Sequence, residues 1–196
     1  MPTQLTRTQK RQNETRERIF RAAMQLFAEK GFENTTVAEI TEAADIGKGT
    51  FFTYFPTKEA IFRQPGQLAL EAIASAAQAG LAQGQPVAQV LKGALTASAA
   101  WHEANKSLTG QMVKSNFSFS LDDASSKGKL LELLVRLVAA GQQAGEFKQD
   151  IQAQDAALVL AGVYFSVIAY WATREDRPLA GRMAAALDVI LKGLAA

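Results

Sequence analysis

Apolar residues recur at helical spacing along almost the whole chain, and no stretch alternates apolar and polar residues for long. The composition is rich in residues that favour helices, and the hairpin dipeptides Asn-Gly and Asp-Gly do not occur. Since the period of the apolar positions is the main sequence signal of secondary structure, this pattern predicts an all-α fold.

The composition also excludes several kinds of site. Cysteine is absent and histidine occurs once, at His102, which removes disulfide frameworks, thiol nucleophiles and nearly every Cys/His zinc arrangement. We therefore expect no metal and no cofactor. With 196 residues, 48% of them hydrophobic, the chain can build one or two domains with an apolar core. Residues 1–13 are basic without a following apolar run, which predicts a cytoplasmic protein.

The first of three predicted N-terminal helices begins at about Asn13, a candidate N-cap, and carries an apolar stripe at helical spacing. Residues 1–12 are predicted to form a flexible basic arm in front of it. Gly31 is expected to end the helix in the left-handed conformation, with the apolar side chain of Phe32 folded back on the helix.

Two short helices are predicted to follow the first. Residues 36–39, Thr-Val-Ala-Glu, form a capping box that starts the second helix. A turn over residues 45–47 leads to a third helix at about 48–54, and a fourth helix is expected to begin near Lys58. Two short helices joined by a tight turn and packed on a longer one make a helix-turn-helix domain, placed at residues 13–57.

Basic charge is concentrated at the N-terminal end. The net charge is only +2, but residues 1–30 hold seven Lys/Arg against three Asp/Glu, whereas from Gln64 onward eleven Lys/Arg meet eleven Asp/Glu. This gradient directs the N-terminal end towards a polyanion such as nucleic acid. A solvated basic tail without a partner shows the same gradient, so charge alone does not decide between the two.

The third predicted helix has two unlike faces. At 3.6 residues per turn, Phe51 and Phe55 fall together on a side that we expect to be buried. The opposite side carries Lys48, Gly49, Phe52 and Thr53. Such an outward face suits the major groove of DNA, where hydroxyls contact base edges and apolar groups contact thymine methyls. The plainer interpretation is the surface of an ordinary helical bundle.

The N-terminal part of the chain resembles the TetR (tetracycline repressor) family of transcription regulators over residues 14–63. The resemblance rests on Arg16-Glu17-Arg18-Ile19, on Gly31-Phe32, on residues 35–40 (TTVAEI) and above all on residues 48–62 (KGTFFTYFPTKEAIF). A helix, a capping box, a recognition helix and a Tyr-Phe-x-x-Lys-Glu exit occur in the family's order and spacing. The resemblance implies an N-terminal three-helix helix-turn-helix domain followed by a helical ligand-binding and dimerisation domain at 58–196.

Through this resemblance, DNA contacts are expected from a set of residues in and around the third helix. These are Thr36, Lys48, Gly49, Thr50, Phe52, Thr53, Tyr54 and Lys58. Thr36, Tyr54 and Lys58 are expected to meet phosphates, and Lys48, Gly49, Thr50 and Thr53 to lie at or near bases. Phe52 is expected to pack on sugar or methyl groups.

The sequence departs from the family pattern at three positions. Asp45 stands where the family usually has a turn glycine, Gly47 where it often has a capping serine, and Phe52 where it often has a tyrosine. Aspartate tolerates a left-handed turn less well than glycine, whereas glycine caps a helix nearly as well as serine. Because Phe52 cannot donate a hydrogen bond, we expect one phosphate contact to be missing there.

The body from residue 58 onward is expected to bind a small-molecule effector. Candidate pocket residues are Trp101, Gln111, Met112, Phe117, Phe119, Tyr164, Ile168 and Trp171. The last three share one face of a predicted helix. For any single one of them, a place in the core is the plainer interpretation. His102 is interpreted as a hydrogen-bonded or an exposed histidine rather than a catalytic or metal-binding one.

The last two predicted helices, at about 154–173 and 178–194, are expected to form a homodimer. Their interface is assigned to Val163, Val167, Tyr170, Leu179, Met183, Leu187, Ile190 and Leu194. Faces as apolar as these are rarely left in water. A two-fold dimer would present two recognition helices about 34 Å apart, which matches successive major grooves of a palindromic operator.

The predicted function is that of a ligand-responsive transcription regulator: a repressor that binds double-stranded operator DNA as a homodimer and is released by a small molecule. A helix-turn-helix protein without an effector is the alternative. An enzyme is less favoured, because one histidine allows no Ser/His/Asp triad and no Gly-rich phosphate loop occurs. A membrane protein is also less favoured, because the run at 156–173 that just reaches spanning length is solitary and diluted by small residues.

Overall fold

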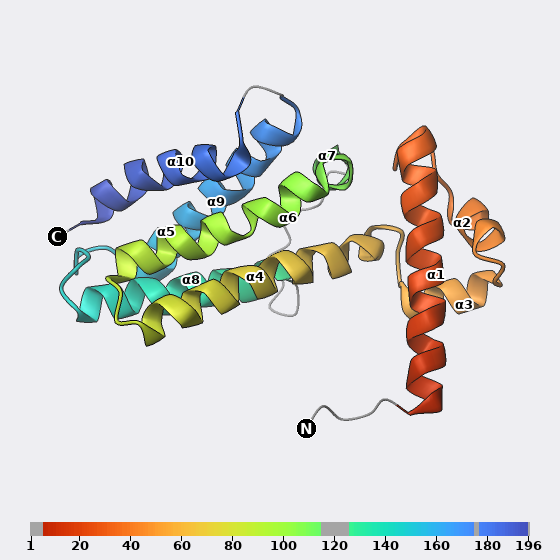
Figure 1. Ribbon diagram of the computed structural model, residues 1–196, viewed down its shortest axis with the longest axis horizontal. Coiled ribbons are helices and arrows are strands. Elements are labelled where there is room, and N and C mark those ends of the chain that lie inside the picture. Colours follow the sequence, from red (N-terminus) through yellow and green to blue (C-terminus); the bar gives the residue numbers. More distant parts are fainter. Residues whose placement is uncertain (1–5, 115–125, 175–176, 196) are drawn as a thin grey trace. The chain divides into compact units, whose positions relative to one another are not determined.

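The computed structural model describes residues 6–114, 126–174 and 177–195, without the side chains of residues 63 and 64. The chain folds into two compact units, of which the first holds the residues up to Phe62 and the second most of the residues from Arg63 onward. Within the described ranges every element is a helix (Figure 1). The predicted all-α class is therefore confirmed.

The first unit consists of α1 (Arg7–Lys30), α2 (Val37–Ala43), α3 (Lys48–Tyr54) and a 3₁₀ helix, η1 (Glu59–Phe62). Their buried side chains include Ile19, Ala23, Phe27, Phe32, Ile40, Ala44, Phe51, Phe55, Ile61 and Phe62. The rings of Phe27, Phe32 and Phe62 lie 5.0, 5.1 and 5.5 Å apart between centroids. This aromatic cluster holds η1 against α1, so the first unit extends past the predicted boundary at residue 57.

α1 begins earlier than the sequence analysis predicts. Thr6, not Asn13, is the N-cap: its Oγ1 accepts the N–H of Gln9 at 3.3 Å, and Oε1 of Gln9 accepts the N–H of Thr6 at 2.8 Å. This capping box satisfies two N–H groups at the helix start. Residues 7–12, predicted to be part of a flexible arm, are therefore helical.

Gly31 ends α1 in a conformation that is only partly the predicted one. Its φ is +85°, as a left-handed ending requires, but its ψ of 159° lies outside the left-handed helical region. The N–H of Gly31 donates to the carbonyl of Phe27 at 3.0 Å. Phe32 is buried and meets the Phe27 ring edge-on, which confirms that it folds back on the helix.

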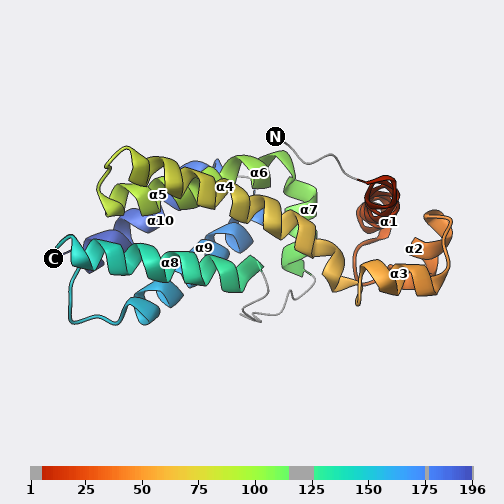
Figure 2. The ribbon, with the colours of Figure 1, turned by 90° about the horizontal axis from the view of Figure 1, so that it is seen from below.

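The second unit is built from α4 (Arg63–Ala82), α5 (Val87–Ala97), α6 (Ala99–Ala104), α7 (Lys106–Lys114), α8 (Ser126–Gln143), α9 (Ala153–Ala172) and α10 (Leu179–Leu194). Figures 1 and 2 show α4, α5, α8, α9 and α10 running side by side. Among the core side chains of this unit are Leu91, Leu95, Leu134, Leu160 and Leu187, all fully buried. α4 begins at Arg63 rather than near Lys58, because η1 occupies the intervening residues.

α9 is the one helix of the described residues that is long and apolar enough to cross a membrane by length and composition. The core helix of a soluble protein passes the same test. In this structure Ala157, Leu160, Ala161 and Tyr164 of α9 are buried in the core of the second unit, where α9 packs against α8 and α10. Burial in this core accounts for the apolar character of one face of α9.

The strongest apolar stripe of α10 does not face outward, so the predicted dimer interface is wrong in part. Leu179, Met183 and Leu187 are fully buried and Leu194 is 9% exposed, all in the core of their own chain. The reason is that α10 packs on α5, α6 and α9, and this packing covers the stripe. Ile190 is partly buried against the same core. On α9, Val163 and Val167 are partly buried and Tyr170 is exposed.

Candidate nucleic-acid interface and effector site

α3 has the two faces that its sequence predicts. Phe51 and Phe55 are buried in the first unit. The exposed residues are Lys48, Gly49, Thr50, Phe52 and Thr53, and Tyr54 is partly buried. Phe52 is the large apolar side chain of this face, with 51% of its surface in solvent. The hydroxyl of Thr53 donates to the carbonyl of Gly49 at 3.0 Å, which leaves its oxygen free to accept.

The turn between α2 and α3 depends on Asp45, whose φ is +49°. Among the described residues it alone combines a side chain with a positive φ, a conformation that aspartate tolerates better than most residues. The N–H of Ile46 closes the turn by donating to the carbonyl of Thr41 at 3.0 Å. Gly47 then caps α3 with extended backbone and no side-chain hydrogen bond. The turn thus forms and orients α3 although position 45 lacks the glycine that the family usually has there.

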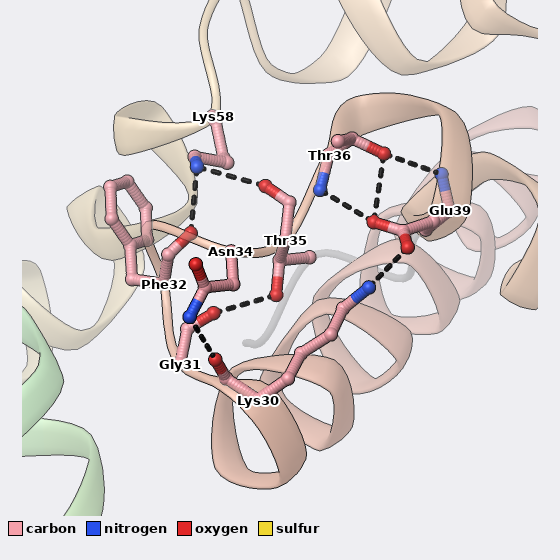
Figure 3. Close-up of polar contacts among 8 residues, drawn as sticks. All are labelled: Lys30, Gly31, Phe32, Asn34, Thr35, Thr36, Glu39 and Lys58. Atoms are coloured by element: carbon pink, nitrogen blue, oxygen red, sulfur yellow. Dashed lines mark hydrogen bonds and ion pairs between the residues drawn. The ribbon is translucent and has the colours of Figure 1, made fainter.

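Lys58 lies just beyond α3 and is bound to the loop between α1 and α2 (Figure 3). Its Nζ donates to the carbonyls of Phe32 at 2.7 Å and Thr35 at 2.9 Å, and lies 4.1 Å from the centroid of the Phe32 ring. An ammonium group has three N–H donors. Two of them are used inside the protein, so Lys58 has at most one left for the phosphate contact predicted for it.

Thr36 is exposed at the start of α2, where its hydroxyl is part of a capping box (Figure 3). It donates to Oε2 of Glu39 at 2.8 Å and accepts the N–H of Glu39 at 3.3 Å. Lys30 forms an ion pair with the same carboxylate. The hydrogen bonds from Lys30 and then from Thr36 lower the pKa of Glu39 to about 2. The hydroxyl hydrogen of Thr36 is thus engaged within the protein.

The second unit contains a buried polar network centred on His102. Nδ1 of His102 lies 3.1 Å from Oγ1 of Thr109, and Nε2 lies 3.4 Å from the hydroxyl oxygen of Tyr164. The Tyr164 hydroxyl donates to Oγ of Ser98 at 3.0 Å, and Ser98 donates to the carbonyl of Leu95 at 3.0 Å. This order of donors fits the tautomer that carries the proton on Nε2. The network joins α5, α6, α7 and α9.

Burial keeps the ionisable members of this network neutral. It lowers the pKa of His102 to about 4 and raises the pKa of Tyr164 to about 12. Of the two interpretations of His102 in the sequence, hydrogen-bonded and exposed, the structure supports the first. Sequence reasoning missed Ser98 and Thr109, because a single Ser or Thr in a helical segment gives no signal of a distant partner.

The structure brings together only some of the predicted effector residues. Tyr164, Ile168 and Trp171 are buried on one face of α9. Trp101 is partly exposed, with its ring edge-on to His102 at 5.1 Å between centroids, and His102 in turn meets the Tyr164 ring at 6.5 Å. Gln111 and Met112 are partly buried on α7, and Phe117 and Phe119 lie outside the described residues.

Two polar features lie near the predicted effector residues of the second unit. Oε1 of Gln111 is buried and has no hydrogen-bond partner among the described residues, an arrangement that costs about 1–3 kcal/mol. At the Trp171 end of α9, Nζ of Lys106 lies 5.4 Å from the Trp171 ring and donates to the carbonyl of Arg174 at 3.1 Å. A buried acceptor and the Lys106 ammonium group therefore lie in the part of the chain where a small-molecule site is predicted.

Comparison with known proteins matches residues 19–64 to the family model described as bacterial regulatory proteins, tetR family. The transcriptional regulator TcmR of Streptomyces glaucescens is 35% identical over 89 residues, which span 45% of this chain and only 39% of that protein. The transcriptional repressor KstR of Mycolicibacterium smegmatis is 28% identical over 84% of this chain and 79% of its own length.

Solved structures extend the similarity to the second unit. FadR of Thermus thermophilus, a TetR-family transcriptional repressor crystallised with lauroyl-CoA, is 31% identical, with a TM-score of 0.73 over 92% of this chain and 95% of that one. FadR of Bacillus subtilis, crystallised with stearoyl-CoA, is 18% identical over 91% of this chain and 98% of that one, with a TM-score of 0.68, and shares the fold.

Proposed function

The chain belongs to the TetR family of bacterial transcriptional regulators, and on that premise we propose that it is a ligand-responsive repressor. It would bind a palindromic operator as a homodimer in the cytoplasm and leave the operator when a small molecule binds to the second unit. The observation that carries the proposal is α3, which combines a buried aromatic side with an exposed side of cation, glycine, hydroxyls and Phe52. We assign the chain no enzymatic role.

The DNA contact is tested most directly at Phe52. We propose that it packs on a sugar or on a thymine methyl, because it is exposed and has no polar atom. Phe52→Ala is expected to weaken binding about tenfold on a duplex selected by the wild type from a random pool, measured by fluorescence anisotropy. Its melting temperature should stay unchanged. Leu68→Ala removes another exposed apolar side chain, on α4, and is the control. If Phe52→Ala binds the duplex with wild-type affinity, α3 is ruled out as the recognition helix.

For the effector we propose a fatty acyl-CoA thioester. The T. thermophilus repressor that binds lauroyl-CoA is similar over nearly the whole chain. The amide N–H groups of the CoA arm could satisfy Oε1 of Gln111, which is buried without a donor. Lys106, whose Nζ lies 5.4 Å from the Trp171 ring, offers a cation for its phosphates.

The effector test uses lauroyl-CoA, free CoA and lauric acid as separate probes. Lauroyl-CoA is expected to raise the melting temperature and to release the selected duplex, since a ligand stabilises the state that it binds. CoA alone and lauric acid alone should do neither at the same concentration. A protein that binds DNA but responds to none of the three would contradict the proposed effector class and favour a regulator without an acyl-CoA signal.

For the dimer we propose a face formed by exposed residues of α9 and α10, in place of the buried stripe. Val159 is 52% exposed, Tyr170 44% and Val189 72%. Small residues between them on α9, Gly162 and Ser166, would allow two helices to approach closely. Apolar side chains this exposed are explained by a second copy of the chain.

A further inference from the structure

The N-terminal half of α1 stands clear of the core of the first unit. The first buried residue of this helix is Ile19, although the helix begins at Arg7. At a rise of 1.5 Å per residue, residues 7–18 form about 18 Å of helix, here called the N-terminal projection. Figure 1 shows these turns continuing beyond α3 with no other helix of the unit beside them.

The projection starts where the recognition helix ends. The guanidinium of Arg16 lies 5.5 Å from the centroid of the Phe55 ring, which directly follows α3. Before Arg16, all but one of the described residues of α1 are exposed, and the exception, Thr15, is partly exposed. One end of the projection therefore lies beside the end of α3, the helix proposed to contact DNA.

Its composition selects the kind of partner. Residues 7–18 read RTQKRQNETRER, with five Lys/Arg, two Glu and no apolar side chain. At 100° per residue, one face of α1 collects Arg7, Lys10, Arg11, Glu14, Arg18 and Arg21. A membrane surface or an apolar groove would need an apolar stripe, which the projection lacks. A polyanion needs only cations on one face.

An unpacked helix of this length is marginal in water, and its neighbouring cations repel one another. The Thr6–Gln9 capping box and the continuity with the packed part of α1 preserve it. We infer that the projection is a rigid basic helix that binds the phosphates of DNA flanking the half-site contacted by α3. About 18 Å corresponds to about five base pairs, so each protomer's footprint extends by about that length. The inference rests on the proposed DNA-binding function.

The first test is a triple variant, Arg7→Gln, Lys10→Gln and Arg11→Gln, since glutamine preserves helix propensity. The probe is a selected duplex with about eight additional base pairs at each end. On it, we expect the slope of log K against log salt to become shallower by about 0.9 for each phosphate that is no longer neutralised. For the three substitutions together, the slope should change by about three per protomer. On the same duplex trimmed to the two half-sites, variant and wild type should bind alike. Lys129→Gln, Arg136→Gln and Lys192→Gln, exposed in the second unit, give a matched change of charge.

The second test keeps every charge and breaks only the helix. Asn13→Pro removes one helical hydrogen bond and uncouples residues 7–12, while the rest of α1 can start at the new proline. We expect this variant to bind the long duplex no more tightly than the trimmed one. Asn13→Ala should still bind the long duplex more tightly, as the wild type does. Both should melt like the wild type, because residue 13 is exposed.

The possible results distinguish a failure of the flanking contact from a failure of the proposed DNA-binding function. If the wild type selects no duplex, the proposed function fails. If it selects one, and the triple variant keeps the wild-type salt slope on the long duplex, the flanking contact is overturned. If the triple variant weakens binding but Asn13→Pro does not, the projection acts as a flexible basic arm and the rigid helix is overturned.

Discussion

His102 is buried in the second unit with both ring nitrogens facing hydroxyl groups, from Thr109 and Tyr164. These partners do not compensate the loss of water around a charged imidazole, so burial lowers its pKa to about 4. A neutral histidine can donate at one nitrogen and accept at the other, as the network requires. Acidification would turn the acceptor into a second donor and break one contact.

The pKa of His102 predicts how stability depends on pH. The unfolded chain takes up this proton near pH 6.5, whereas the folded chain takes it up only near pH 4. The unfolded state therefore binds more protons between these values, and the free energy of unfolding decreases as pH falls through that range. The melting temperature of the wild type should drop more between pH 7.5 and 5 than that of His102→Gln, which has no such proton. An equal drop in both would contradict the buried neutral histidine.

Lys58 is expected to matter for stability as well as for DNA. Lys58→Met keeps the aliphatic stem but leaves the carbonyls of Phe32 and Thr35 without their donor. We expect a loss of about 2 kcal/mol in the free energy of unfolding from urea denaturation. Lys48→Met is the control, because Lys48 is exposed on α3 and should affect DNA binding alone. Equal stability of the two variants would make Lys58 a phosphate contact without a structural role.

At the scale of elements, the predictions succeed where both ends of a helix are marked locally. The Thr36 capping box and the turn at 45–47 fix α2 and α3, and the sequence places α3 at its observed bounds, Lys48–Tyr54. The predicted start of α1 is wrong because Asn13 and Thr6 are both good N-caps. The Gln three residues after Thr6 completes the motif and is the signal that distinguishes them.

Two glycines in helices of the second unit should respond to alanine in opposite ways. Gly141 in α8 is buried, and an added Cβ would overlap the ring of Phe147. Gly141→Ala should therefore lower the free energy of unfolding by about 1–3 kcal/mol. Gly93 in α5 has open space at the same position, so Gly93→Ala should raise it by about 0.5–1 kcal/mol through helix propensity. Chemical denaturation of both variants measures the two signs, and the same sign in both would refute this account of the α8 packing.

At the scale of the molecule, sequence patterns predict that a face is buried but not what covers it. The stripe that contains Leu187 is regular enough to predict, yet it fits a partner subunit and the chain's own core equally well. Only the packing of α10 on α5, α6 and α9 shows that the chain's own core, not a partner subunit, covers this stripe. The same limit applies to the network: Tyr164 and Ser98 are 66 positions apart, and no local pattern joins them.

The dimer proposal leads to a test with a built-in contrast on one helix. Val189 is 72% exposed on α10, and Leu187, two residues earlier, is fully buried. A charge at position 189 enters water in a monomer but is buried without a partner in a dimer, so Val189→Asp should give a folded monomer. Leu187→Asp places the charge in the core and should instead lower the melting temperature sharply or prevent folding. Light scattering measures the oligomeric state, and circular dichroism measures folding.

Because two α3 helices are needed for one palindrome, Val189→Asp should also lose affinity for the selected duplex. A Val189→Asp protein that remains dimeric with full affinity would place the interface elsewhere.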